Sequence, residues 1–174
     1  CLTKDSLLAM YSSKKIYKNT EINFPFSELA IKTNVKMPIH TIKVIKKLTK
    51  QKLNNKKVLI YGASYKNDIG DTRYSPSEIL YENLKTLKCF IKVCDPFVKF
   101  WKELNINVKP NINKIEKYDL IIFAVNHKEF RKINLNKLTK KNIVIETGNV
   151  LSRAQISTLK KNKAIFYKIG QGKY

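Results

Sequence analysis

GASYKNDIGDTRYSP, residues 62–76, is the stretch that decides the fold, because it joins a predicted strand to a predicted helix. The apolar run over 58–61 is typical of a buried parallel strand. Pro76 suits a first helical turn and Ser75 can cap it, so a helix is expected to follow. Such a connection usually needs only a few residues, and this one takes about a dozen. Open α/β sheets bind ligands at the carboxyl ends of their strands, so this polar 62–76 loop is the first candidate for a functional site.

Strand and helix patterns alternate along the chain from Lys56 onward. Strands are expected at 57–61, 90–94, 119–125, 142–146 and 164–167, and helices at 76–87, 97–103, 127–131 and 152–161. Strands separated by helices form βαβ units, so the predicted fold class is α/β, a Rossmann-like, mostly parallel sheet with helices on both faces.

The first fifty residues are predicted to be helical instead. A helix is expected to start at Asp5 or Ser6, and a long helix reaches Leu48, with Pro38 expected to kink or interrupt it. The polar stretch 50–57 resembles a domain boundary. We therefore expect a helical segment over 1–54 and an α/β domain over 55–174.

The charge of the chain has a compositional explanation. The formal net charge is +22, and the 35 basic residues are 32 Lys and three Arg. Lys, Ile and Asn share AT-rich codons, and the lysines are dispersed, whereas nucleic-acid sites favour clustered Arg. We therefore expect no nucleic-acid partner, although such a basic surface attracts anionic metabolites.

The hydropathy, the N-terminus and the cysteines of the sequence indicate the cellular compartment. No apolar run approaches the length of a membrane span and no signal-peptide pattern is present, so no membrane partner is expected. The chain begins with Cys1 rather than Met, which suggests processing, truncation or a missing N-terminal part. Cys89 and Cys94 flank or lie in a predicted strand without metal-ligand spacing, which favours core residues of a cytoplasmic protein and no metal site.

The 62–76 loop allows two interpretations. Of the Rossmann pattern G-x-G-x-x-G it has only Gly62, so it is a poor candidate for holding the pyrophosphate of NAD in that manner. Lys66 and Arg73 could contact phosphates, with Tyr65 beside a base or sugar. Alternatively, Asp68, Asp71 and Arg73 simply hold the loop together by ion pairing, and the residues alone do not decide.

Three other residues are candidates for a chemical role. Asp95 could accept hydrogen bonds from a ribose, but an Asp before Pro favours a turn. His127 could be a base, although a capping or surface position is favoured. Cys1, close to Lys4 and to a helix start, could be a nucleophile.

Taken together, these segments resemble a known family. CLTKD at 1–5, NVKMP at 34–38, the 62–76 loop, Asp95-Pro96 and NHKEF at 126–130 occur in the order seen in UDP-glucose/GDP-mannose dehydrogenases. The resemblance covers essentially the whole chain. It implies the end of a helical central domain followed by a complete C-terminal Rossmann-like domain for a UDP-sugar, without the N-terminal NAD domain.

The resemblance implies an NAD-dependent UDP-sugar 6-dehydrogenase, most simply one that converts UDP-glucose to UDP-glucuronate. In that family the residue matching Cys1 forms a thiohemiacetal and then a thioester during two hydride transfers to NAD. Asp5 matches the acid that helps to activate water. The fragment alone is expected to be inactive, and the alternative is a non-catalytic nucleotide-sugar-binding module.

The resemblance also implies binding roles. Lys4 and Arg73 match residues at the NAD site, and Tyr65 and Lys66 match contacts to the nucleotide sugar. A homodimer through the long helix is expected. Gly148 stands where the family often has an arginine that contacts the sugar nucleotide, which leaves the substrate open: Lys4-Asp5 resembles UDP-glucose enzymes, and Met37-Pro38 those that oxidise N-acetylated sugars.

Overall fold

The computed structural model describes residues 5–18 and 23–171, and the chain divides into two compact units, Cys1–Met37 and Pro38–Tyr174. The first unit contains α1 (Asp5–Tyr11) and a π-helical turn, η1 (Ser12–Ile16). Helix α2 (Pro25–Leu48) begins in the first unit and ends in the second. The helices predicted in this half are therefore present, while the domain boundary predicted at 54/55 stays a prediction.

Helix α2 is not interrupted at Pro38, which is buried inside it. Proline removes only one hydrogen bond from the ladder, and a 24-residue helix keeps the others. Within the described part of the chain, no helix combines the length and the apolar character needed to cross a bilayer.

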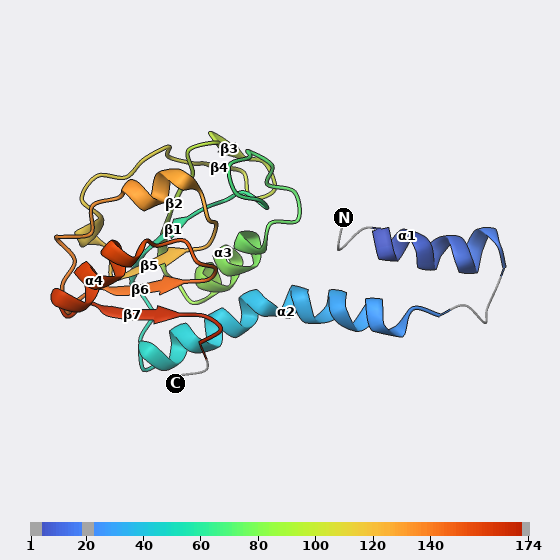
Figure 1. The fold of residues 1–174 in the computed structure, drawn as a ribbon, viewed down its shortest axis with the longest axis horizontal. Coiled ribbons are helices and arrows are strands. Elements are labelled where there is room, and N and C mark those ends of the chain that lie inside the picture. The colour runs from blue at the N-terminus through green and yellow to red at the C-terminus, as the bar shows by residue number, and fades with distance from the viewer. Residues whose placement is uncertain (1–4, 19–22, 172–174) are drawn as a thin grey trace. The chain divides into compact units, whose positions relative to one another are not determined.

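The second unit is built on five parallel strands (Figure 1). The strands are β1 (Lys57–Tyr61), β2 (Phe90–Cys94), β5 (Leu120–Phe123), β6 (Ile143–Glu146) and β7 (Ile165–Lys168), in the order β2-β1-β5-β6-β7. The helical elements are α3 (Pro76–Thr86), α4 (Arg153–Lys161) and the 3-10 turns η2 (Ile115–Lys117) and η3 (Lys128–Lys132). The predicted α/β, Rossmann-like parallel sheet is confirmed.

Both faces of the sheet are covered, as expected. Alternate residues of each strand point to opposite faces. One face packs against the C-terminal half of α2 and against α3, through Ile42, Ile45, Val58, Ile60, Leu80, Leu84, Ile122 and Ile145. The other packs against α4, η2 and η3, through Leu59, Tyr61, Ile115, Ile121, Phe123, Phe130, Val144 and Leu159.

The helix predicted over 97–103 is wrong. The chain instead forms a small antiparallel pair, β3 (Phe100–Trp101) with β4 (Ile106–Asn107). Asn105 has a φ of 53°, a conformation that Asn tolerates, and it reverses the chain between the two strands. Trp101 is fully buried, with its ring 6.4 Å from that of Tyr81. Burial of this side chain against α3 outweighs the local helical pattern.

The chain adds β2 on one side of β1 and then β5, β6 and β7 on the other side. The carboxyl ends of β1 and β5 therefore form the topological switch point of the sheet. Gly62 leaves β1 at this point with a φ of 105°. A Cβ atom built on Gly62 would lie 2.5 Å from the Cβ of Val125, the second residue after β5. Glycine is thus required for the two strand ends to approach this closely.

Candidate functional site

The 62–76 loop leaves the sheet at the switch point and is closed on itself. The Tyr65 amide donates to the Asp71 carbonyl at 2.7 Å, which closes the tip of the loop. At its end, the Ser75 hydroxyl donates to the Ser64 carbonyl at 3.2 Å and accepts from the Ser77 amide at 3.3 Å as the cap of α3. The loop is therefore held in a defined shape by its own hydrogen bonds.

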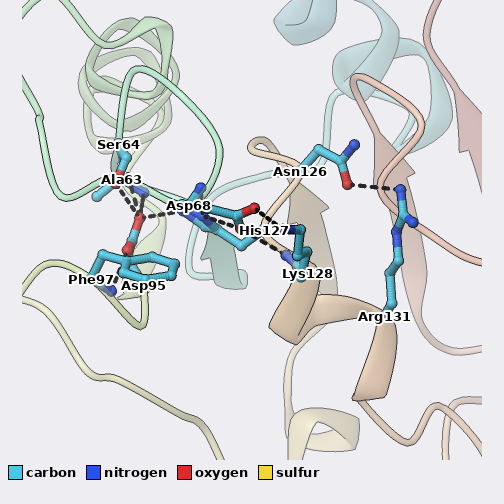
Figure 2. Close-up of polar contacts among 9 residues, drawn as sticks. All are labelled: Ala63, Ser64, Asp68, Asp95, Phe97, Asn126, His127, Lys128 and Arg131. Carbon is cyan, nitrogen blue, oxygen red and sulfur yellow. Dashed lines mark hydrogen bonds and ion pairs between the residues drawn. The ribbon is translucent and has the colours of Figure 1, made fainter.

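Asp95 anchors the start of the loop to the end of β2 (Figure 2). Its Oδ2 atom accepts hydrogen bonds from the Ala63 amide at 2.8 Å, the Ser64 amide at 3.1 Å and the Ser64 hydroxyl at 2.9 Å. Its Oδ1 atom accepts from the Phe97 amide at 2.9 Å, so the predicted turn at Asp95-Pro96 is present. Both oxygens are occupied and the side chain is fully buried, which leaves no atom for a ribose.

His127 joins this anchor to the tip of the loop, as Figure 2 shows. Its Nε2 lies 3.0 Å from Oδ2 of Asp95, and its Nδ1 accepts the Asp68 amide at 2.8 Å. The amide can only donate, so Nδ1 carries no proton, and the tautomer assigned by these bonds has its hydrogen on Nε2. Both ring nitrogens are therefore engaged within the protein.

His127 is the N-cap residue of η3, but its side chain makes no cap hydrogen bond, and the predicted surface position is wrong because the imidazole is fully buried. Its ring lies 5.0 Å from that of Phe97 and 5.1 Å from that of Phe130. The sequence does not reveal this position, since it depends on three segments meeting at one edge. His127 acts as a cross-link, and its burial excludes it as a base for a bound substrate in this conformation.

The carboxylates of the site are held in their charged form. For Asp95, burial alone raises the pKa, but the hydrogen bonds from His127, Phe97 and Ala63 outweigh it and hold the pKa below its usual value. For Asp68, the Lys128 amide at 3.1 Å is the main cause of a lowered pKa. The Lys128 ammonium, 3.4 Å from Oδ2 of Asp68, adds to the effect.

Asp71 and Arg73 form an ion pair within the loop. The guanidinium donates from Nε at 2.9 Å and from Nη2 at 2.7 Å, a bidentate arrangement that lowers the pKa of Asp71 to about 2. Loop-holding ion pairing is thus confirmed for this pair, whereas Asp68 pairs with Lys128 outside the loop. The role of Arg73 at an NAD site stays a prediction, for a side chain whose charge is already partnered.

Tyr65 and Lys66, the predicted contacts to the nucleotide sugar, lie at the tip of the loop. Lys66 is exposed and Tyr65 half-buried. Among the described residues, neither side chain has a recorded hydrogen-bond or ion-pair partner. An ammonium group and an aromatic ring are therefore both available to a ligand at the switch point.

The remaining predicted residues are not part of this arrangement as described. Cys1 and Lys4 lie outside the described residues, and Asp5 is the exposed first residue of α1 in the first unit. In residues 5–18 and 23–171, no three side chains of His, Cys, Asp or Glu gather as a metal site would need. Cys94 is buried, which raises the pKa of its thiol to about 12 and leaves it inert as a nucleophile.

The loop does not fit the pyrophosphate of a dinucleotide. Ser64 and Asn67 stand where the Rossmann pattern has its second and third glycines, and the Ser64 hydroxyl is bonded to Asp95. The described residues of the loop offer cations and an aromatic ring, and none of them is a cysteine. Such groups are chemically suited to an anionic ligand.

Sequence reasoning missed the cross-link of Asp95, His127 and Asp68. A signal was present, since Asp95 directly follows β2 and His127 follows β5 closely. Carboxyl ends of parallel strands meet at one edge, so such polar residues are candidates for contact.

A family model for the UDP binding domain of the UDP-glucose/GDP-mannose dehydrogenase family matches residues 59–153, which include the end of β1, the 62–76 loop and the cross-link. The chain belongs to the UDP-glucose/GDP-mannose dehydrogenase family. The resemblance carried by the sequence motifs is confirmed, and the loop belongs to this family's UDP binding domain.

Curated relatives within the UDP-glucose/GDP-mannose dehydrogenase family are longer than this chain. A UDP-N-acetyl-D-mannosamine dehydrogenase of Methanocaldococcus jannaschii is 28% identical over 150 residues, 80% of this chain and 32% of the relative. A UDP-glucose 6-dehydrogenase of Rickettsia bellii is 27% identical over 168 residues, 91% of this chain and 38% of the relative. The chain thus spans about a third of the length of these relatives.

A solved structure supports the fold assignment. The NDP-N-acetyl-D-galactosaminuronic acid dehydrogenase of Methanosarcina mazei matches 98% of this chain and 37% of its own, with a TM-score of 0.83 and 22% identity. At that identity the match shows the common fold alone.

Proposed function

We propose that this chain is the nucleotide-sugar-binding portion of an NAD-dependent UDP-sugar 6-dehydrogenase. The observation that carries the proposal is the 62–76 loop, which belongs to the UDP binding domain of its family and lies at the switch point of the sheet. There it presents the side chains of Tyr65 and Lys66, which have no polar partner within residues 5–18 and 23–171.

The loop suits a nucleoside diphosphate. The Lys66 ammonium provides a point charge for phosphate oxygens, and the Tyr65 ring provides a flat apolar surface for a base or sugar. Asp95 and His127 fix the conformation of the loop through hydrogen bonds to its backbone. Little conformational entropy is therefore lost when a ligand binds.

We place N-acetylmannosamine ahead of glucose as the sugar of this substrate. Met37-Pro38 resembles members that oxidise N-acetylated sugars, and relatives named UDP-N-acetyl-D-mannosamine dehydrogenase match over much of the chain. The UDP-glucose reading, expected from Lys4-Asp5, is supported by one of the named relatives.

The catalytic roles remain proposals for the longer protein. Cys1 as nucleophile and Asp5 as the acid that activates water rest on the resemblance, as do Lys4 and Arg73 near NAD. NAD supplies the hydride acceptor in such an oxidation. The described residues offer no dinucleotide turn, so we assign the binding of its pyrophosphate to residues outside this chain.

We also propose a cytoplasmic homodimer. Cys89 and Cys94 are free thiols, which suits a reducing compartment. Exposed apolar side chains on α2, such as Phe26, Leu29 and Val35, suit a second copy of the helix. Sedimentation equilibrium should give twice the 20.3 kDa chain mass, and a monomer at all concentrations would contradict this part.

The binding proposal predicts selective stabilisation by UDP-sugars. The chain is titrated with UDP-N-acetylmannosamine, UDP-glucose, UDP-N-acetylglucosamine and GDP-mannose. Its melting temperature should rise at lower concentrations of the UDP-sugars than of GDP-mannose. At a ligand concentration a hundred times Kd, the gain in unfolding free energy is about 2.7 kcal/mol. Lys66→Met should weaken UDP-sugar binding by about tenfold, since it removes a charge-assisted hydrogen bond.

Lys161→Met is the matched control, because Lys161 is an exposed lysine at the end of α4, on the opposite edge of the sheet. It should bind UDP-sugars as the unaltered chain does. If both variants lose the same affinity for UDP-sugars, the loss is due to the lower net charge and not to the position of Lys66. If the unaltered chain binds none of the UDP-sugars, the proposed function is refuted.

A further inference from the structure

The three arginines of the chain share one edge of the sheet. Among 35 basic residues, only Arg73, Arg131 and Arg153 are arginines. Arg73 follows β1, Arg131 follows β5 and Arg153 follows β6, so all three come after carboxyl ends of the parallel strands. Lysines occur at both edges, including Lys52, Lys56 and Lys141 around a pocket at the amino ends of the strands. Arginine donates two parallel hydrogen bonds to phosphate, so its restriction to the carboxyl edge points to an anionic ligand there.

Arg131 differs from Arg73 in its partner. The Arg73 guanidinium is neutralised by the Asp71 carboxylate in bidentate fashion. Among the described residues, the polar contact of the Arg131 side chain is a long one, 3.4 Å from Nη2 to the amide oxygen of Asn126. Figure 2 shows this pair beyond Lys128, on the side away from Asp95. Arg131 therefore keeps an uncompensated positive charge and four other N–H donors.

The backbone beneath Arg131 is firmly held. The preceding residue, Phe130, is buried with its ring edge-on to that of Tyr61 at 5.0 Å. Gln155 of α4 donates from Nε2 to the carbonyls of Phe130 and Ile133, each at 2.9 Å. These bonds fix the backbone on both sides of Arg131, while the Arg131 side chain is exposed. The guanidinium is thus presented from a rigid base.

Open space lies at the neighbouring strand end. Thr147, the first residue after β6, donates from its hydroxyl to the Ala124 carbonyl at 3.1 Å, which places the turn after β6 against the segment that leads to Asn126. A Cβ atom built on the next residue, Gly148, would meet no heavy atom within 4 Å. The space immediately beside Gly148 is therefore not filled by protein atoms, which is compatible with a ligand group next to the end of β6.

We propose that Arg131 binds the diphosphate of the nucleotide ligand, with Asn126 orienting its guanidinium. The proposal rests on the proposed function and adds a residue to that site. It adds a phosphate contact from η3, which follows β5, to the contact of Lys66 from the loop after β1.

Isothermal titration of UDP into four chains tests this assignment: unaltered, Arg131→Gln, Arg131→Lys and Lys132→Gln. Arg131→Gln should weaken UDP binding by about tenfold or more, because a bidentate charged contact is lost. Arg131→Lys should lie between, since lysine restores charge without the fork. Lys132→Gln removes the same charge from the adjacent exposed residue of η3 and should leave Kd within about twofold.

Without ligand, the four chains should have the same melting temperature, because the Arg131 side chain is exposed. If Arg131→Gln and Lys132→Gln bind UDP equally well, the role of Arg131 is overturned while the proposed function stands. If the unaltered chain does not bind UDP, the proposed function and the role of Arg131 both fail.

Discussion

Asp95→Asn should lower the free energy of unfolding by about 3 kcal/mol or more, the range found when one partner of a buried charged network is removed. Four donors converge on Oδ2 of Asp95, from Ala63, Ser64 and His127, and a fifth from Phe97 meets Oδ1. An amide has one acceptor oxygen, so in either orientation its NH₂ group faces a buried donor. Urea unfolding of the two chains measures the difference.

Asp119→Asn is the matched control at the opposite edge of the sheet. Asp119 also accepts a backbone amide, from Lys57 at 2.8 Å, and pairs with Lys56 at 3.0 Å. Its side chain is 38% exposed, so water can replace a lost partner and the cost should be about 1 kcal/mol. Equal costs at the two positions would contradict the anchoring role of Asp95.

The pH dependence of stability provides a second readout for Asp95. The pKa of Asp95 is lower in the folded chain than in the unfolded one, where an Asp has a pKa of about 3.9. The stabilisation is therefore complete above the unfolded value and is lost as the pH falls through the folded value. The stability difference between the unaltered chain and Asp95→Asn should be constant near neutrality and shrink below about pH 4.

The sheet was predictable from sequence because its signals are local. The runs over 57–61 and 90–94 coincide with β1 and β2, and Ser75-Pro76 marks the start of α3. The segment 97–103 was misread because burial of Trp101 against Tyr81 is a tertiary contact. Periodicity within a short window contains no information about such a partner.

The location of the site was predictable from sequence, but the hydrogen bonds that connect its residues were not. A long polar loop after a strand, with Lys66 and Tyr65 at its tip, is visible in the sequence. The link from Asp95 through His127 to Asp68 joins residues 32 and 59 positions apart. Only the strand order, which brings β2, β1 and β5 side by side, makes these residues neighbours.

Gly62→Ala should destabilise the chain by about 3 kcal/mol or more and abolish UDP-sugar binding, because a methyl group at this position meets both strain and steric overlap. The φ of Gly62 is 105°, which side chains rarely adopt. The new Cβ atom would lie 2.5 Å from Cβ and Cγ2 of Val125 and 2.8 Å from its backbone nitrogen. The last contact involves main chain, so relief requires the ends of β1 and β5 to separate at the switch point.

Gly148→Ala is the matched control for the same added methyl group, since open space surrounds Gly148 and its φ lies outside the left-handed region. Its unfolding free energy should stay within about 1 kcal/mol of the unaltered chain. Adding Val125→Ala to Gly62→Ala removes Cγ2 but leaves the overlap with Cβ and the backbone nitrogen, so it should restore only a minor part of the loss. Full recovery in that double variant, or equal stability of the two alanine variants, would show that the strand ends can separate freely and that glycine is not required at the switch point.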